Sequence, residues 1–306
     1  MCAKEVCSTP SMDKNDSRIS HLFLVAVVLL WGANVGIVKS AFQDINLVLL
    51  AAIRFTVSGV LMLLLVLWRE KDLRIERQDW SLMLVVGGLG IGIYQTLWSV
   101  GLQWTSATNS ALIFTIQPLL GAVYVDLTKK ESVPRRRYLG MLLALGGVIL
   151  VILKPTARLH FSTETFLGDF VNLAAAGCAA IFFSVSPRPL LRKYSPMRLL
   201  GYCMVIGSVV LWIAAPFCAK SMAFDQIGPK AWWPLIYSTL FAGMLGHTLW
   251  YEGIGRIGAT KTLVYHYFIP VWAAIFNHFL MGEEIFPQQI MGGALILWGV
   301  HNALRS

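Results

Sequence analysis

Charged residues are scarce in this chain. Only 13% of its 306 residues are Asp, Glu, Lys or Arg, whereas soluble domains carry roughly 25%. Apolar residues make up 57% of the chain, and the mean hydropathy is +0.66. A soluble protein of this composition could not cover its surface with polar groups. The composition therefore disfavours a soluble enzyme or binding domain and predicts a polytopic membrane protein.

Several site types are absent from the sequence. The five cysteines include no CxxC pair and no Cys/His cluster, which argues against a disulfide framework and a zinc site. There is no Walker A motif for ATP, and the glycine run at 87–92 lies inside an apolar stretch instead of after a strand. No paired carboxylates or nucleophile with its base lie at membrane depth. We therefore expect no cofactor, no metal and no enzymatic activity.

Ten apolar runs are long enough to cross a bilayer, which needs about 20 residues per helix. They lie at 21–42, 46–68, 80–103, 105–126, 137–154, 166–187, 196–219, 232–256, 259–281 and 288–305. The runs are continuous and do not alternate in polarity as barrel strands do. The sequence predicts an all-α integral membrane protein with ten transmembrane helices.

The N-terminal residues 1–20 are polar and lack the apolar core of a cleavable signal peptide. They are expected to form a cytoplasmic tail, in which residues 1–11 are either a tail or an over-extended start ahead of Met12. The net charge of +9 would suggest nucleic acid in a soluble protein. Here nineteen of the 25 Lys and Arg residues fall on one side of the predicted spans and four on the other. This bias predicts both termini in the cytoplasm and no nucleic-acid partner.

The chain matches itself without gaps at a shift of 152 residues. The matched positions are Thr96-Leu97-Trp98 with Thr248-Leu249-Trp250, Pro118 with Pro270, Glu131 with Glu283, Gly140 with Gly292, and Gly147 with Gly299. The match divides the chain into a first repeat at 21–154 and a second at 155–306. Because each repeat holds five helices, the second copy is inverted in the membrane. Inverted repeats around a site at the midplane are typical of secondary transporters.

The sequence also resembles the EamA family of the drug/metabolite transporter superfamily. The resemblance rests on Trp31-Gly32-Ala33-Asn34 with Lys39, on Ala52-Ile53-Arg54-Phe55, and on Ala107-Thr108 through Gln117-Pro118, followed by Gly258-Ala259-Thr260 through Ile269-Pro270-Val271 and Gly282-Glu283. It covers nearly all of residues 21–305. The resemblance implies ten helices, an inverted repeat, and transport, often export, of amino acids and other small metabolites. His247, Glu252 and His266 depart from the family pattern.

Ionisable side chains at membrane depth are costly and need an explanation. Arg54 either binds a substrate carboxylate or phosphate with its guanidinium or makes a hydrogen bond that packs helices. Lys39, near the end of the first span, either snorkels to the headgroups or contacts substrate.

Glu252 either forms an i,i+4 ion pair with Arg256 or binds a proton and a substrate ammonium in turn. Together with His247 and His266 it could relay protons as the coupling ion. However, His247 and Glu252 are about 140° apart around a helix, which weakens the relay. Packing is the alternative for each histidine.

A second group of candidate binding residues is neutral: Asn34, Tyr94, Trp98, Gln117, Trp250 and Tyr265. Trp98 and Trp250 are related by the repeat and could line a central cavity through apolar or cation–π contacts. The alternative is helix packing or a lipid-facing aromatic belt. Pro118 and Pro270 each remove a helical hydrogen bond and predict symmetric hinges.

These features favour a secondary transporter of the inner or plasma membrane. Its substrate would be a small polar metabolite, an amino acid or related amine, with export as the direction and protons as a candidate coupling ion. The alternatives are a flippase for lipids or lipid-linked sugars and, with less support, an intramembrane enzyme.

Overall fold

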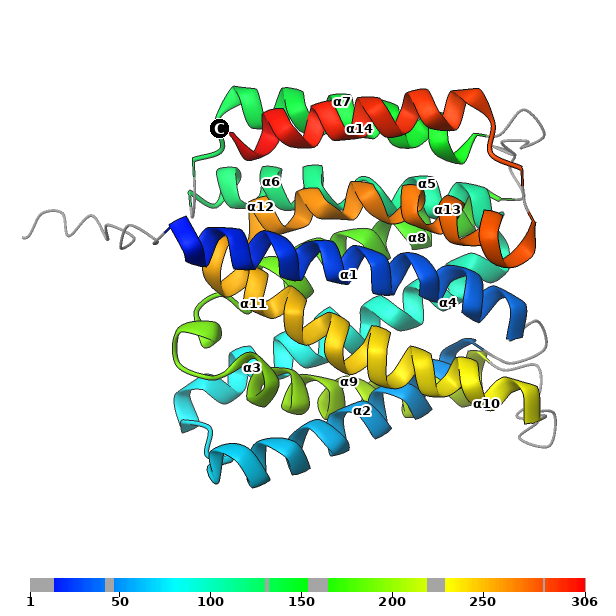
Figure 1. Cartoon of the computed structure of the whole chain (residues 1–306). Coiled ribbons are helices and arrows are strands. Elements are labelled where there is room, and N and C mark those ends of the chain that lie inside the picture. The colour runs from blue at the N-terminus through cyan, green and yellow to red at the C-terminus, as the bar shows by residue number, and fades with distance from the viewer. Residues whose placement is uncertain are drawn as a thin grey trace, which may run out of the picture.

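The computed structural model describes residues 14–41, 47–129, 132–153, 165–218, 229–282 and 284–305, and these residues contain helices and no strand. Figure 1 shows one bundle of helices that run roughly side by side. The first half contains α1 (Lys14–Ala41), α2 (Leu47–Glu70), η1 (Arg77–Asp79), α3 (Trp80–Gly87), η2 (Gly88–Ile93), α4 (Tyr94–Trp104), α5 (Ala107–Phe114), α6 (Gln117–Leu127) and α7 (Arg135–Ile152).

The second half contains α8 (Phe166–Cys178), η3 (Ala179–Val185), η4 (Leu190–Arg192), α9 (Pro196–Cys218), α10 (Pro229–Ile236), η6 (Tyr237–Gly246), α11 (His247–Ile257), α12 (Ala259–Val264), η7 (Tyr265–Phe268), α13 (Ile269–Met281) and α14 (Pro287–Leu304). The elements η2, η3 and η6 are wide π-helical turns that continue the neighbouring α-helices without a gap. The start of α1 and the end of α14 lie on the same side of the bundle (Figure 1).

Six helical segments are long and apolar enough to cross a membrane. They are 47–70, 77–104, 108–127, 166–192, 196–218 and 259–280. Each overlaps a span predicted from the sequence. The first helix begins at Lys14, ahead of the predicted start at residue 21, and its apolar part covers Arg18–Asn34. Residues 1–11, Glu131, Glu283 and the side chain of Lys39 lie outside the described part of the chain.

Large apolar side chains are exposed on the outside of the bundle. Examples are Phe217, Phe279 and Leu127, which are 87%, 80% and 77% exposed. An apolar exterior this extensive would aggregate in water, but hydrocarbon solvates it. The surface is therefore that of a multi-pass membrane protein.

Equivalent helices of the two repeats pack on each other, α2 on α9 and α7 on α14, and these pairs form opposite edges of the bundle (Figure 1). Glycines bring α7 and α14 into backbone contact. A Cβ atom on Gly140 would lie 2.6 Å from the carbonyl oxygen of Gly299, and one on Gly147 would lie 2.6 Å from that of Gly292. Small residues permit this close approach in membrane helices.

We expect Gly147→Ala to destabilise the protein because its added methyl group would press on the backbone of α14. Overpacking of this kind costs roughly 1–3 kcal/mol. The neighbouring substitution Gly146→Ala is the control, since a Cβ there meets only Leu295 at 3.8 Å. Thermal unfolding in detergent should show a lower midpoint for Gly147→Ala alone. Equal midpoints for the two variants would contradict the close crossing.

Ion pairs tie the end of α2 and the segment that follows it to the segment after η4 and the first turn of α9. Arg198 Nη2 lies 2.7 Å from a Glu70 carboxylate oxygen, and Arg198 Nη1 lies 3.0 Å from Asp72. Lys193 Nζ lies 3.0 Å from Glu76, and the hydrogen bond that it donates there lowers the pKa of the Glu76 carboxyl. This ion-pair network joins the two halves at one end of the bundle.

The lowered pKa of Glu76 determines whether its contribution to folding stability rises or falls with pH. A carboxyl whose pKa is lower in the folded state stabilises the fold above its unfolded pKa of about 4.3, and this contribution is lost as the pH falls through the folded pKa. The stability of the wild type should fall between pH 6 and pH 3, and we expect this fall to be smaller in Lys193→Gln. Arg69→Gln, at an exposed arginine nearby, should show the same fall as the wild type. Thermal unfolding midpoints across this pH range measure the fall. An identical pH profile for Lys193→Gln and the wild type would contradict the contribution of this pair.

Candidate functional site

Several helices break near the middle of the bundle. Pro118 lies in the first turn of α6, after a turn at 115–116, and Pro270 lies in the first turn of α13, after the 3-10 turn η7. The wide turns η2 and η6 interrupt the regular α-helical hydrogen bonding before α4 and α11. The two prolines predicted as hinges therefore stand at helix breaks. Irregular backbone at membrane depth is tolerated where it is buried in protein or lines a cavity.

The wide turn η6 leaves carbonyl groups that accept hydrogen bonds from distant helices. Trp31 Nε1 of α1 donates to the carbonyl of Ala242 at 2.9 Å. Arg54 Nη2 of α2 donates to the carbonyl of Ser238 at 3.2 Å. A π-helical turn often marks a functional site, because its backbone groups are displaced from regular pairing. Here η6 contacts both α1 and α2.

His247 follows directly after η6 and is buried. Its Nδ1 lies 2.7 Å from the carbonyl of Gly243 and 3.1 Å from that of Ala242. At Gly246 a Cβ atom would lie 2.6 Å from Trp31 Nε1. Glycine at this position therefore lets the indole of Trp31 reach the η6 backbone.

Aromatic rings form a continuous chain through the centre. The ring of Trp31 lies 5.3 Å from His247, 5.2 Å from Trp250 and 5.6 Å from His266, measured between centroids. On its other side, His247 lies 5.3 Å from the ring of Phe183. We call these five residues the central cluster.

The chain of rings continues from the central cluster into the first repeat. Tyr94 lies 6.4 Å from Phe183 and 5.9 Å from Phe114, and Phe114 lies 6.2 Å from Trp98. The guanidinium of Arg54 lies near Tyr94 and His247. The structure thus brings together six residues singled out in the sequence: Arg54, Tyr94, Trp98, His247, Trp250 and His266.

Two ring pairs occupy equivalent positions in the repeats. Trp250 contacts His266 at 4.4 Å, and at the shift of 152 residues the corresponding pair is Trp98 with Phe114. The side chain of Trp250 is fully buried. Its Nε1 and the Nδ1 of His266 are enclosed without a hydrogen-bond partner among the described residues, as is the Nε of Arg54. Such groups are expensive to leave unpaired, so the central cluster presents unused polar atoms.

Four other candidates lie elsewhere. Glu252 accepts a hydrogen bond from Arg256 Nε at 3.0 Å, with both side chains about one-third exposed. Tyr265 hydrogen-bonds His21, which lies ten residues before Trp31, or roughly 15 Å along a helix. Gln117 is buried in the first turn of α6, and Asn34 lies in α1 with a buried Oδ1 that has no described partner. The described contacts connect His247 and His266 through Trp31 and not through Glu252.

Asp169, which lies in the first turn of α8, is not among the residues singled out in the sequence. Its carboxylate accepts hydrogen bonds from Thr105 Oγ1 at 2.5 Å and from Asn109 Nδ2 at 3.2 Å. These partners flank the junction between α4 and α5. The signal was available, because Asp169 is an acidic residue inside the predicted span 166–187, and an ionisable residue in a span needs an explanation.

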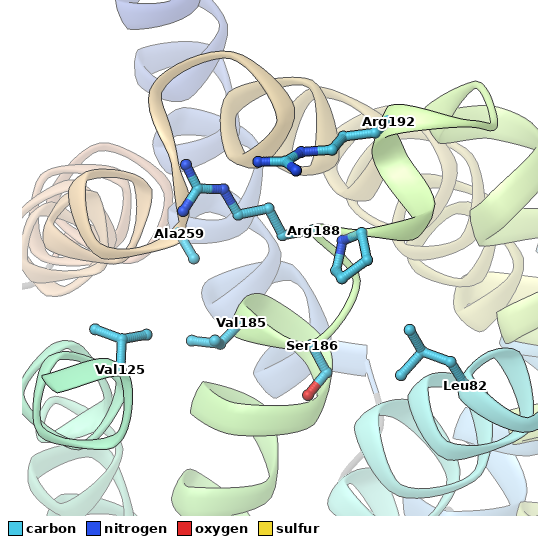
Figure 2. A pocket seen from close by; sticks show the side chains of 8 residues that line it. Leu82, Val125, Val185, Ser186, Arg188, Arg192 and Ala259 are labelled. Carbon is cyan, nitrogen blue, oxygen red and sulfur yellow. The ribbon is translucent and has the colours of Figure 1, made fainter. Parts of the chain in front are cut away.

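A cavity of about 390 Å³ opens beside the broken helices. Its walls come from α3, α6, η3 and α12, through Leu82, Val125, Val185 and Ala259. Arg188 and Arg192 extend over it from the segment that follows η3, and both guanidinium groups point toward the side of Ala259 (Figure 2). Among the described residues no group of His, Cys, Asp and Glu side chains could hold a metal ion.

A helical bundle with an apolar exterior and broken helices that carry polar groups to its centre defines a multi-pass membrane protein. A model of the EamA-like transporter family matches residues 18–153 and again residues 166–303, so the chain belongs to this family and carries two copies of its repeat.

Relatives of similar length support this assignment. The chain is 28% identical to the uncharacterized transporter YyaM of Bacillus subtilis (strain 168) over 92% of each chain. It is 22% identical, over 90% of each chain, to a probable terminal-alkyne amino-acid exporter of Streptantibioticus cattleyicolor. A crystal structure with 19% identity superposes with a TM-score of 0.79 and covers 94% of this chain and 96% of the other.

We expect His266→Phe to keep the fold and to match or exceed the wild-type stability. Phenylalanine is the residue at the equivalent position of the first repeat, and the substitution removes an enclosed nitrogen whose unpaired state costs about 1–3 kcal/mol. Thermal unfolding of the ligand-free protein in detergent measures this, with Phe114→His as the reciprocal control, which should be less stable. A large loss of stability in His266→Phe would contradict the unpaired state of Nδ1.

Proposed function

We propose that the chain crosses the cell membrane ten times as two inverted five-helix repeats, with both termini in the cytoplasm. The contact of α7 with α14 supports the inversion. Gly140 meets Gly299, and Gly147 meets Gly292, so the contacts run in opposite directions along the two helices. The shift of 152 residues exchanges one contact for the other, as expected for a two-fold axis. The positive-inside bias supports the orientation.

We infer that the protein is a secondary transporter that works by alternating access and exports an amino acid or related amine. The central cluster beside Arg54 carries this inference. Enclosed nitrogen atoms of Arg54, Trp250 and His266 have no described partner, and they suit the oxygen atoms of a carboxylate. The aromatic faces of Trp31 and Trp250 suit an ammonium group.

Arg54 combines the two functions considered for it from the sequence. One of its nitrogen atoms bonds the Ser238 carbonyl and positions the guanidinium, while Nε is left for substrate. A positioned guanidinium can bind a carboxylate through charge-assisted hydrogen bonds. The related exporter from Streptantibioticus cattleyicolor is named for an amino-acid substrate, which supports both substrate class and direction.

Protons are the proposed coupling ion, and two carboxylates are candidates for binding them. Glu252 forms an ion pair with Arg256, whereas Asp169 accepts hydrogen bonds at the junction of α4 and α5. Protonation of Asp169 would remove acceptor capacity at that junction. Pro118 and Pro270 are proposed as the hinges, since both stand at helix breaks.

We expect Arg54→Gln to lower uptake at least tenfold, because the glutamine side chain carries no charge for the substrate carboxylate. The assay is uptake of a mixed pool of labelled amino acids into proteoliposomes with an imposed pH gradient. Arg69→Gln, at an exposed arginine at the end of α2, is the control and should retain wild-type uptake. Full activity of Arg54→Gln would remove this residue from the binding site. If labelled lipid crosses the bilayer and no soluble metabolite does, the protein is a flippase and not a metabolite transporter.

Glu252→Gln and Asp169→Asn separate the two coupling candidates in the same assay. The variant at the coupling carboxylate should lose the response to the pH gradient and retain exchange of substrate across the membrane without a gradient. The other variant should respond as the wild type does. If both variants keep the full response, neither carboxylate couples transport to protons.

A further inference from the structure

Two polar contacts between the repeats lie toward opposite ends of the bundle. Asp169 of α8 accepts hydrogen bonds from Thr105 and Asn109, at the junction of α4 and α5. His21 of α1 hydrogen-bonds the hydroxyl group of Tyr265, the first residue of η7. α1 begins at one end of the bundle, whereas α5 and the end of α4 lie toward the other end (Figure 1). Each contact therefore joins a helix of one repeat to a junction between helical segments of the other.

The helices α1 and α8, which carry His21 and Asp169, correspond to each other. A Cβ atom on Gly101 of α4 would lie 2.4 Å from Nδ2 of Asn172 in α8. At the shift of 152 residues Gly101 corresponds to Gly253 of α11, where a Cβ atom would lie 2.6 Å from Cδ2 of Leu24 in α1. Leu24 and Asn172 therefore occupy equivalent positions, which differ by 148 residues. The two matches of the family model begin at residues 18 and 166, with the same difference.

Asp169 is the counterpart of His21 at this shift. Their neighbours also correspond, since Asn109 beside Asp169 is the counterpart of Lys261, which lies near His21. The same position in both repeats thus carries an ionisable side chain that contacts the other repeat. An ionisable residue inside a span needs an explanation, and two at equivalent positions are explained by one role that both ends of the bundle share.

The two ends of the bundle differ in how tightly they are closed. Where α4 meets α5, a Cβ atom on Gly168 would lie 2.5 Å from the carbonyl carbon of Trp104. Ser110 and Asn172 are both buried there and share a hydrogen bond of 3.0 Å. The cavity of about 390 Å³ opens at the other end, where α1 begins and α12 starts at Ala259 (Figure 1). Direct backbone contact therefore closes the first end, while the second end is more open.

Polar contacts of this kind suit surfaces that separate and close again. Separating apolar surfaces in the presence of water exposes them at a free-energy cost that grows with their area. A hydrogen bond contributes less net stability, because water replaces the lost partner once the surface is wet. Hydrogen bonds at the end of a bundle can thus hold that end closed and still be broken each time it opens.

We propose that these contacts are the two gates of the transport pathway. The outer gate consists of Asp169 with Thr105 and Asn109, and the inner gate consists of His21 with Tyr265. This inference rests on the proposed alternating-access function and assigns the residues that separate in turn. Opening to the outside separates Asp169 from the junction of α4 and α5, and opening to the cytoplasm separates His21 from Tyr265. Weakening one gate therefore favours the conformation that is open at that end and closed at the other.

The test is the rate of cysteine modification by a hydrophilic thiol reagent, without substrate, in nanodiscs, where both ends are accessible. In a cysteine-free background, Ser106→Cys is the outer reporter and Ala259→Cys is the inner reporter. Tyr265→Phe removes only the hydroxyl of the inner gate. It should speed modification of the inner reporter by about threefold or more, as expected for the loss of one hydrogen bond, and slow that of the outer reporter. Asp169→Ala should do the reverse.

Two matched substitutions are the controls. Tyr202→Phe also removes a hydroxyl that donates a hydrogen bond, here of 2.8 Å to the carbonyl of Leu73, but it belongs to neither gate. Asp126→Ala removes a carboxylate at an exposed position of α6. Neither should change the two rates. Combining Tyr265→Phe with Asp169→Ala should return the ratio of the two rates toward that of the wild type, which damage to the fold cannot do.

The decisive rate is the one at the end distant from each substitution. If each gate substitution changes only the rate at its own end, the contact is local packing and the proposal is wrong. Rates in the gate variants equal to those of the wild type would also overturn it. Because the measurement uses no substrate, its result is independent of the proposed amino-acid substrate, whose failure would instead appear as no uptake by the wild type.

Discussion

The structure depends on one constraint: backbone polar groups inside the hydrocarbon of a bilayer must be satisfied by the protein itself. Regular helices meet this constraint alone. In the π-helical turn η6, carbonyl groups also accept hydrogen bonds from side chains of Trp31 in α1, Arg54 and Ser58 in α2, and His247 in α11. The need to satisfy an irregular backbone therefore gathers polar and aromatic side chains at the centre of the bundle.

The two repeats have diverged at this centre. The first repeat carries Phe114 at the position where the second carries His266, and both rings contact the tryptophan of their own repeat. Packing is thus common to both halves, while the enclosed nitrogen atoms of Trp250 and His266 occur in the second half. We interpret the duplicated packing as the scaffold and the unpaired polar atoms as the part that is specific to this protein's substrate.

Much of the fold could be predicted from the sequence, because apolar runs and a 152-residue repeat are local or periodic signals. The i,i+4 spacing made an ion pair with Arg256 one of the two alternatives for Glu252, and the structure contains this pair at 3.0 Å. A hydrogen bond from Arg54 that packs helices was also among the alternatives considered from the sequence. The acceptor is the carbonyl of Ser238, 184 residues away, and only the tertiary structure identifies it.

Other features of the site could not be predicted from the sequence. Gly246 looks like any small residue in an apolar run, and only the approach of Trp31 explains it. The sequence suggested a link between His247 and His266 through Glu252, which lies in the same repeat. The described contacts connect the two histidines through Trp31 of α1 instead. The cavity required residues from four segments to come together.

Transport by alternating access requires the two ends of the bundle to open in turn, and the accessibility of introduced cysteines measures this. In a cysteine-free background, Ala259→Cys reports on the inner cavity, and Ser106→Cys reports on the opposite end of the bundle, ahead of α5. Under alternating access, the amino acid transported in proteoliposomes should change the two modification rates in opposite directions, slowing one and accelerating the other. Rates that do not respond to substrate, or that both rise or both fall, would contradict alternating access between the two repeats.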